Sequence, residues 1–434
     1  MIRHRYQTIL GAIPDDWKAR SLRSLLTDDL SGDWGDDEGD VTLSVLRSTN
    51  FTDSGNLDLA DIARRGFSST KAAQIQVQPN DVLIERSGGG PNQPVGRVAM
   101  IREMMPETGF ANFVQALRPN PSEIVPELLL WMLHQLNRSG FVEKLQHQTT
   151  QMRNLDLRDY LKILLPVPSN PEEQTSIAET LNAADDYIRA LEEEIRKAER
   201  VAVALNQVHF AAGPHTVRFP YEYGTTRTIP HGWASKRLGK IADVTSGITL
   251  NQDREAADNG VRYLTVVNVY RGRIDLTEER YLESRGNEAE SKRLNRHDIL
   301  VVEGHANPGE IGRAALVSER EVGMSFQNHL FRVRLKNEDE VRARFLVRAL
   351  NSPRVRRHWV ATANTSSGLS TINRTALRRL IIPLPKPGEQ DLIVERLEAA
   401  EEQVTALNKQ LIAARRVKQS LLQNLLTGKT RLKL

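Results

Sequence analysis

The sequence predicts an α+β protein that consists of two copies of one unit, each a globular domain followed by a long helix. Three observations lead to this prediction: short motifs that occur twice in the same order, short apolar runs mixed with helical segments, and two stretches with heptad periodicity. The length of 434 residues agrees, because one domain typically takes roughly 150 residues.

The internal repeat has an offset of about 216 residues. Ile13-Pro14-Asp15-Asp16-Trp17 returns as Ile229-Pro230-His231-Gly232-Trp233, and 229 − 13 = 216. Further pairs follow in the same order at an offset of 216 or 217: Asp81-Val82 with Asp298-Ile299, Val95–Arg97 with Ile311–Arg313, Leu164–Pro168 with Ile381–Pro385, and Glu173-Gln174 with Glu389-Gln390. Because the stretches between these motifs differ almost everywhere, the repeat predicts one fold that carries two different surfaces.

Each globular domain mixes strands and helices. The apolar runs at Val82–Ile84, Ile299–Val302 and Arg262–Val269 are bounded by Gly, Asn, Asp or Pro and predict strands. Ile124–Leu136 and Val341–Leu350 carry apolar residues at helical spacing and predict helices.

A heptad pattern begins after each Pro-x-Pro turn. Apolar residues alternate spacings of four and three over about five heptads, which predicts two helices of roughly 50 Å. Antiparallel packing of the two helices on each other would relate the domains by an approximate twofold axis; parallel pairing, or packing of each helix on its own domain, are the alternatives. Only His209 and Lys418 interrupt the seam, which otherwise includes Ile177, Leu181, Ile188, Leu191, Ile195, Ile393, Leu397, Val404, Leu407 and Leu411.

Together these motifs resemble the specificity subunit of type I restriction–modification systems. The resemblance rests on the two Ile-Pro-x-x-Trp motifs, the two Pro-x-Pro turns followed by Glu-Gln, and the ending Leu425-Leu426-Thr427-Gly428-Lys429. The polar loops at 149–154 and 366–371 are also similar to a loop of this family. The resemblance implies target-recognition domains at 1–171 and 229–386, conserved helical regions at 172–212 and 387–434, and a linker at 213–228.

The family resemblance also implies a function. Each recognition domain is expected to read one half of a bipartite, asymmetric DNA site, while the helices set the unread spacer. Two methyltransferase subunits are expected to dock on the helices and methylate adenine at N6, and restriction subunits with motor and nuclease activity join through them. No cofactor is expected in this chain, since S-adenosylmethionine, ATP and magnesium would belong to the partner subunits.

The residues agree with a non-catalytic chain. It contains no cysteine, no Asn/Asp-Pro-Pro-aromatic loop of an adenine methyltransferase and no Gly-x-x-x-x-Gly-Lys-Ser/Thr phosphate loop. The acids Asp81, Glu85, Asp298 and Glu303 lie at strand-like positions without the nearby lysine of a nuclease. His305 has no histidine counterpart in the first copy, so the sequence predicts no metal site.

The charge is distributed unevenly. Residues 229–386 contain 27 Lys and Arg against 18 Asp and Glu, a net +9, whereas residues 13–168 contain 16 against 21, a net −5. Seven acids between Asp28 and Asp40 account for more than that deficit. The net charge of the second domain therefore fits contact with phosphates directly. The acidic charge of the first domain is compatible with DNA binding if these acids form a flap that faces away from DNA or contacts a partner.

Base reading requires long polar side chains on protruding loops. The residues of this kind that we predict to contact DNA are Arg47, Asn50, Arg86, Asn92, Gln93 and Arg153 in the first copy, and Arg271, Arg273, His305, Asn307, Gln327 and Asn328 in the second. The shared Gly-Arg pairs that end at Arg97 and Arg313 fit a scaffold or phosphate role better than base reading.

Two other functions compete with a DNA-specificity subunit. One is a self-contained endonuclease with duplicated recognition domains, and the other is a coiled-coil assembly scaffold that binds no DNA. The chain has no apolar run long enough for a membrane helix and no apolar signal core, so a cytoplasmic location is expected.

Overall fold

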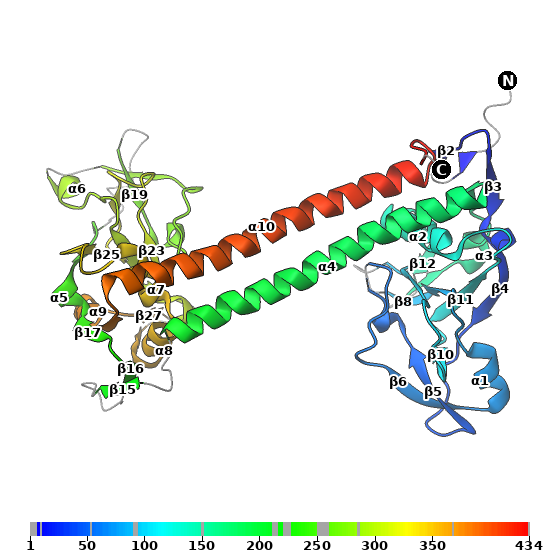
Figure 1. Cartoon of the computed structure of the whole chain (residues 1–434), viewed down its shortest axis with the longest axis horizontal. Helices are drawn as coiled ribbons and strands as arrows, with labels where there is room; N and C mark the ends of the chain where they lie inside the picture. The colour runs from blue at the N-terminus through cyan, green and yellow to red at the C-terminus, as the bar shows by residue number, and fades with distance from the viewer. Residues whose placement is uncertain are drawn as a thin grey trace. The chain divides into compact units, whose positions relative to one another are not determined.

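The computed structural model describes residues 7–8, 11–52, 54–89, 94–148, 152–210, 216–219, 227–249, 260–283, 287–366 and 369–432. The chain forms two compact units: unit 1 consists of residues 1–193 and 408–434, and unit 2 of residues 194–407. Helix α4 (Pro171–Phe210) begins in unit 1 and ends in unit 2, and helix α10 (Pro387–Leu425) does the reverse (Figure 1). Each unit is a mixture of strands and helices, which confirms the α+β class.

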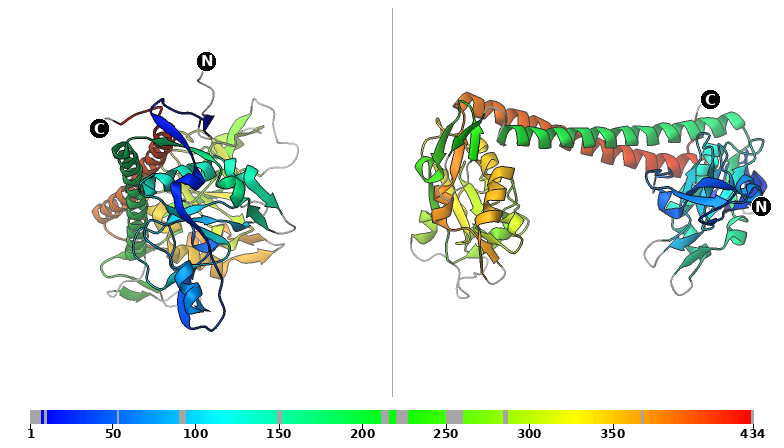
Figure 2. Two further views of the ribbon diagram at one scale, coloured as in Figure 1. Left: turned by 90° about the vertical axis from the view of Figure 1, so that its right-hand side faces the viewer. Right: turned by 90° about the horizontal axis from the view of Figure 1, so that it is seen from below.

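Within the described residues, unit 1 contains four sheets besides the short pair β1 (Gln7–Thr8) and β2 (Gly11–Ala12). Their strand orders are β4-β11-β7-β9, β10-β5-β6, β12-β13-β8 and β14-β3. Figure 2 shows the ribbon diagram from two further sides. The strands are β3 (Trp17–Ser21), β4 (Leu26–Ser31), β5 (Val41–Leu46), β6 (Ala63–Phe67), β7 (Val82–Glu85), β8 (Ser87–Gly89), β9 (Val98–Met100), β10 (Thr108–Phe110), β11 (Val114–Pro119), β12 (Gln146–Gln148), β13 (Arg153–Leu155) and β14 (Leu164–Pro168). The short helices are η1 (Leu22–Leu25), η2 (Ser48–Asn50), α1 (Ser69–Ile75), α2 (Pro126–Arg138), η3 (Phe141–Leu145) and α3 (Leu157–Tyr160).

Unit 2 repeats these four sheets in the orders β18-β25-β21-β23, β20-β19-β24, β22-β27-β26 and β17-β28, beside the pair β15 (Thr216–Phe219) and β16 (Arg227–Pro230). Its strands are β17 (Ala234–Arg237), β18 (Ala242–Ser246), β19 (Val261–Leu264), β20 (Arg280–Leu282), β21 (Ile299–Val302), β22 (Gly304–His305), β23 (Ala314–Leu316), β24 (Ser325–Phe326), β25 (Leu330–Leu335), β26 (Asn364–Ser366), β27 (Leu369–Thr371) and β28 (Ile381–Leu384). Its short helices are α5 (Leu238–Ile241), η5 (Val266–Asn268), α6 (Glu288–Ser291), η6 (Pro308–Glu310), α7 (Ala343–Asn351), α8 (Pro353–Thr362) and α9 (Arg374–Arg379). Even the parallel pairs recur, β5 with β10 and β19 with β24, so the repeated motifs do mark a repeated fold.

One sheet in each unit is covered by apolar side chains on both faces. In β7, Val82 and Ile84 join the core that includes α2 and both long helices, while Leu83 points to a second core on the other face. This alternation is what the period of two in a strand requires. The strand β21 divides its side chains in the same way between two cores of unit 2.

The repeated Trp and Glu-Gln motifs join each globular part to its long helix. In unit 1 the Trp17 indole N–H donates to Glu173, and the Gln174 side chain accepts from the Val125 N–H at the start of α2 at 2.8 Å and donates to the Pro168 carbonyl at 2.9 Å. In unit 2 the Trp233 indole N–H donates to Glu389 at 2.9 Å. The Gln390 side chain accepts from the Arg342 N–H and donates to the Glu340 and Pro385 carbonyls. The motifs are therefore structural joints.

The long helices pair antiparallel within each unit. In unit 1, Glu192 of α4 pairs with Arg415 of α10, and Asp185, one heptad earlier on α4, pairs with Lys418, which lies later on α10. The predicted seam is inward-facing: Ile177, Leu181, Ile188, Leu191, Ile195, Ile393, Leu397 and Leu411 are buried, and Val404 and Leu407 are half-buried. The predicted antiparallel packing is confirmed.

The strand predicted over Arg262–Val269 is too long. It ends at Leu264 as β19 and continues as the 3₁₀ helix η5, because the Asn268 side chain accepts from the Thr265 N–H at 2.9 Å and so closes a turn. Asparagine side chains compete with strand hydrogen bonds in this way. The strands predicted around Val82–Ile84 and Ile299–Val302 are confirmed, as are the helices that correspond to α2 and α7.

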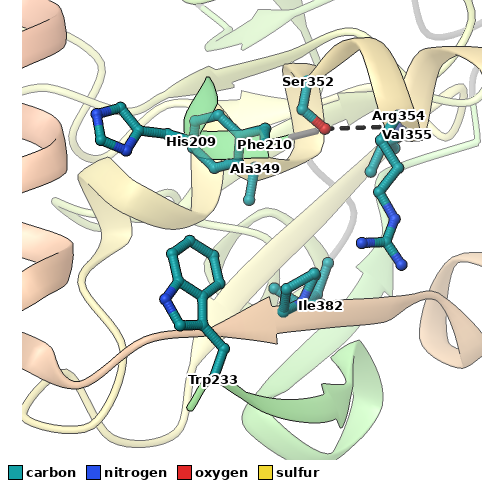
Figure 3. A pocket seen from close by; sticks show the side chains of 9 residues that line it. His209, Phe210, Trp233, Ala349, Ser352, Arg354, Val355 and Ile382 are labelled. Carbon is teal, nitrogen blue, oxygen red and sulfur yellow. Dashed lines mark hydrogen bonds between the residues drawn. The ribbon is translucent and has the colours of Figure 1, made fainter. Parts of the chain in front are cut away.

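The end of α4 closes the core of unit 2 (Figure 3). Phe210 packs 5.6 Å from the ring of Phe345, and a cavity of about 10 Å³ beside it is lined by His209, Trp233 and Ile382, among others. That volume holds about one water molecule at most. Burial lowers the pKa of His209 below its ordinary value, so this interruption of the heptad seam is accommodated as a neutral side chain.

Candidate nucleic-acid interface

A small three-stranded sheet carries Arg153, and Arg86 lies directly before its strand β8. Its central strand β13 pairs with β12 and with β8, so that Arg153 faces Gly89 of β8 across the sheet. Of the polar loop predicted at 149–154, Arg153 and Asn154 begin β13, and residues 149–151 lie outside the described residues.

Arg86 and Arg153 both border this sheet. The Arg86 carbonyl accepts from the Leu155 N–H at 2.8 Å, and the Arg86 guanidinium lies 3.4 Å from both the Ser31 hydroxyl and the Gln115 amide oxygen. Both arginines are half-buried, which limits their rotamers without removing them from solvent. Asn92 and Gln93, which follow β8 in the chain, lie outside the described residues.

Asn50 is interior. Its side-chain amide donates to the carbonyls of Asp58 and Asp61 at 2.8 and 2.9 Å and accepts from the Arg47 N–H at 2.9 Å, and the residue is 2 % exposed. Since no polar group of this amide is left for a base edge, we no longer expect Asn50 to contact DNA. Arg47 is partly exposed and pairs with Asp61 at 2.9 Å, so its reach toward DNA stays a prediction.

The second domain places three of its candidates around the 3₁₀ helix η6. The Asn307 side chain accepts from the Gly309 N–H at 2.9 Å and so begins this helix, while the Asn307 N–H donates to the His305 ring at 3.0 Å. Arg271 donates to the Gly309 carbonyl at 3.0 Å. Arg273 extends from the same turn, with its guanidinium carbon 4.3 Å from the centre of the Tyr270 ring.

Gln327 and Asn328 lie apart from η6, after strand β24. Their main-chain N–H groups bond to the Leu264 and Ile248 carbonyls at 2.8 and 2.9 Å, and both residues are half-buried. The structure fixes their backbone and leaves their role toward DNA a prediction.

The sequence reasoning missed Arg356 and Glu310. Arg356, on helix α8, donates to the Gly309 carbonyl at 3.0 Å and so joins Arg271 at η6. The basic run that contains it, Arg354-Val355-Arg356-Arg357, is visible in the sequence and contributes to the +9 of the second domain.

The shared arginines are anchored to main-chain carbonyls of the scaffold. Arg97 forms a bidentate pair with buried Glu85 at 2.9 and 3.1 Å and also donates to the Ser48 and Phe51 carbonyls. Arg313 donates to the Val266 carbonyl at 2.8 Å, in the 3₁₀ helix that corresponds to the one at Ser48. The preceding glycines have positive φ, and a Cβ on Gly312 would lie 2.4 Å from the Trp359 ring, so the Gly-Arg motif is required by packing.

The carboxylates considered for a nuclease are engaged elsewhere. Asp81 forms a bidentate pair with Arg118 at 2.9 and 3.0 Å, and Asp298 forms the equivalent pair with Arg334 at 2.7 and 2.6 Å. Glu303 lies 3.1 Å from His329. Within the described ranges, no three His, Asp or Glu residues are grouped as metal ligands would be.

The acidic segment of the first domain is held by local cations. Asp29 pairs with Arg23 at 2.5 Å and Asp33 with Lys71 at 3.3 Å, and Asp37 pairs with Arg65. Hydrogen bonding from the Gly35 N–H is the main reason that the pKa of Asp33 is lowered. The net −5 already counts these three cations, so the pairs place them beside the acids and leave the net charge of the domain unchanged.

Arg273 is positioned by a carboxylate whose titration can be measured. The Thr277 hydroxyl, followed by the Thr277 N–H and Arg273, lowers the pKa of Asp275 from 3.8 to about 2. A lowered pKa means that the ionised form stabilises the fold above about pH 4, and this contribution is lost as the pH falls toward 2. We expect a carboxyl NMR titration to place Asp275 near pH 2, Thr277→Val to raise that value, and Arg273→Gln to raise it less. An unchanged pKa in T277V would contradict the assignment.

The two domains share one architecture but carry different polar side chains at equivalent places. Each is joined to part of an antiparallel helix pair. These features define a duplicated recognition protein. The family model described as "Type I restriction modification DNA specificity domain" matches residues 41–200 and again residues 230–414. The chain belongs to this family, which confirms the resemblance found in the sequence. It is a DNA specificity subunit, a component that supplies sequence recognition and no catalysis.

Relatives and solved structures agree with this family. The chain is 25% identical over 391 residues to the type I restriction enzyme StySPI specificity subunit of Salmonella potsdam, covering 89% of this chain and 81% of that protein. It is 21% identical over 382 residues to the EcoKI specificity subunit of Escherichia coli, covering 86% and 78%. The HsdS subunit from Thermoanaerobacter tengcongensis shares the fold with a TM-score of 0.55 at 17% identity, covering 99% of this chain and 100% of that one. The S subunit from M. genitalium does so with a TM-score of 0.53 at 15% identity, covering 97% of each.

Proposed function

We propose that this chain reads a bipartite, asymmetric DNA site, with one half-site for each domain, and positions methyltransferase and restriction subunits on it. The family supplies the role of the whole chain. The assignment of one half-site to each domain rests on the comparison of the two hairpin sheets.

The equivalent hairpin sheets carry opposite chemistry. Arg86 and Arg153 border the sheet of the first domain, whereas the strand pairing places Glu303 and the buried Ser370 at the corresponding positions of the second. Arginine donates a pair of hydrogen bonds to guanine, while Glu accepts from cytosine. Two surfaces with this difference on one backbone suit two different half-sites.

The charges support DNA contact by both domains, through the overall positive charge of the second domain and through one side of the first. The second domain, at +9, attracts the phosphate backbone as a whole. In the first domain, the acids near Asp29 and Asp37 are paired within the unit, and we propose that the Arg86 and Arg153 side faces DNA.

The partners follow from the same proposal. Large apolar side chains are exposed on the long helices, and covering them with a partner subunit would remove apolar surface from water. They are Tyr187, Ile412 and Val417 in unit 1, and Val201, Val203 and Val208 in unit 2, with exposures from 52% to 71%. We propose that two methyltransferase subunits dock here, that restriction subunits join through them, and that S-adenosylmethionine, ATP and magnesium are bound by those partners.

Among the described helices, none is both long and apolar enough to span a bilayer. Since the proposed complex acts on chromosomal DNA, we propose that the chain works in the cytoplasm.

Mapping of N6-methyladenine in cells that express the chain with its methyltransferase tests the proposal. We expect methylation at a two-part motif with an unread spacer. Arg153→Ala should reduce methylation by roughly tenfold or more through one half-site only, since a bidentate base contact is worth about 1–3 kcal/mol.

Arg158→Ala is the matched control, because this exposed arginine lies five residues further along the same chain segment. Absence of methylation, or a motif with a single part, would overturn the proposed function. An unchanged motif and rate in R153A would remove Arg153 from the reading surface while leaving the function in place.

A further inference from the structure

Three arginines of the second domain surround a single carboxylate. Arg271 comes from the turn after η5, Arg313 from the segment after η6, and Arg356 from helix α8. Their nearest guanidinium nitrogens lie 3.9, 3.7 and 3.9 Å from the carboxylate oxygens of Glu310, the last residue of η6. All three distances exceed the 2.7–3.2 Å of an N–H···O hydrogen bond, so Glu310 attracts all three cations and bonds closely to none.

The arginines are held by main-chain groups instead of by the carboxylate. Arg271 and Arg356 both donate to the Gly309 carbonyl at 3.0 Å, and Arg313 donates to the Val266 carbonyl at 2.8 Å. The buried Nε of Arg313 has no hydrogen-bond acceptor among the described residues. These guanidiniums would therefore keep their positions if the Glu310 side chain turned away.

The site carries a net positive charge. Three guanidiniums and one carboxylate leave two charges uncompensated, and the side chains of Arg356 and Glu310 are 50% and 32% exposed. Desolvation lowers the pKa of Arg271, and the nearby Arg356 and Arg313 lower it further against the opposing effect of Glu310. A second anion would relieve this repulsion.

The first domain lacks the arrangement. The positions that correspond to Glu310 and Arg356, at the offset of 216, are Pro94 and Gly140. The cluster is a property of the second domain. It includes the predicted DNA-contacting residue Arg271 and lies beside another, Asn307.

We propose that Glu310 occupies the place of a DNA backbone phosphate, and that a phosphate takes over the three guanidiniums when the duplex binds. The inference rests on the proposed function. A phosphodiester has one negative charge and two free oxygens, which suits donors that converge from three segments. Glu310 then competes with the phosphate for the arginines. This competition lowers the affinity of the site for DNA that lacks the recognised sequence.

The test measures binding of the full chain, with its methyltransferase subunits, to a duplex that carries the mapped site. We expect Glu310→Gln to tighten binding by about fivefold, the effect of one charge at about 4 Å near water. Arg356→Gln should weaken binding and make the dependence of log K on log salt shallower by about 0.9, the value for one phosphate. In a double variant the gain from E310Q should shrink, because the competitor acts through the arginines.

The matched controls are Glu319→Gln and Arg296→Gln, which change the same charges in an exposed pair of the same unit, 3.1 Å apart. Equal effects of E310Q and E319Q would mean that only net charge matters and would overturn the proposal, as would wild-type binding in E310Q and R356Q. Equal melting temperatures of the variants show that folding is intact. If the unchanged complex binds no duplex at all, the proposed function itself fails.

Discussion

Lys418→Ala should destabilise unit 1 by about 3 kcal/mol, since removing one partner of a buried ion pair leaves the other charge unpaired. Lys418 is 9% exposed and pairs directly with Asp185, which is 2% exposed, and its ammonium lies 4.4 Å from the centre of the Trp131 ring. The expected loss is at the lower end of the range for buried pairs, because Arg189 lies 3.6 Å from the same carboxylate and can partly replace the lysine.

Fluorescence during denaturant unfolding measures this loss. The chain has five tryptophans, and replacing Trp233 and Trp359 by phenylalanine leaves only those of unit 1 as reporters. Arg415→Ala is the control on the same two helices, because its pair with Glu192 is largely exposed and is worth at most about 1 kcal/mol. If K418A and R415A cost the same, the buried pair does not stabilise unit 1.

The double variant Asp185→Leu with Lys418→Met separates stability from specificity. Apolar replacement of a buried pair is often neutral, so we expect the double variant to be at least as stable as the wild type. The equivalent positions in unit 2 are Glu401 and Ala202, and Glu401 pairs instead with Arg348 of α7 at 2.7 Å. The buried pair therefore distinguishes the two halves of the helix pair, and we expect its loss to permit association of chains in the wrong register, measurable by light scattering.

The parts of the fold that the sequence predicted well depend on local periodicity. The heptad places Leu181, Leu191 and Ile195 on one side of α4 whatever the rest of the chain does, and all three are buried. The Glu-Gln motifs were also visible, but their role was not, because the bonds of Gln174 reach Val125, which lies 49 residues earlier.

The candidate interface was harder to predict, because residue type alone does not separate a reading side chain from a structural one. Asn50 and Asn268 hold the turn after a strand in both domains, which only the three-dimensional hydrogen bonds reveal. Arg271 and Arg356 are 85 residues apart in sequence and meet only because both donate to one carbonyl, at Gly309. Charge in a sequence thus indicates that a domain is basic, and the fold decides where the charges converge.

Arg431→Ala should release the end of the chain from unit 1 and destabilise this unit by about 2–4 kcal/mol. Arg431 bonds to both oxygens of Asp16, at 2.9 and 2.7 Å, and also contacts Glu173, which is only 3% exposed. Without the guanidinium, the buried Glu173 carboxylate keeps only the Trp17 indole N–H, 3.3 Å away, and an under-solvated charge is costly.

Limited proteolysis, and denaturant unfolding of the chain with Trp233 and Trp359 replaced by phenylalanine, measure the loss of stability in R431A. Adding Glu173→Gln then tests whether the unpaired Glu173 charge is its cause. An amide can still accept from Trp17 but carries no charge, so R431A with E173Q should be more stable than R431A alone. The Arg431 bond is also the main reason that the pKa of Asp16 is lowered, so its contribution is present above about pH 4 and is lost as the solution becomes more acidic. Equal stability of R431A and wild type at neutral pH would show that Gly428, which packs against Pro14 and Trp17, suffices to hold the end of α10 on the first domain.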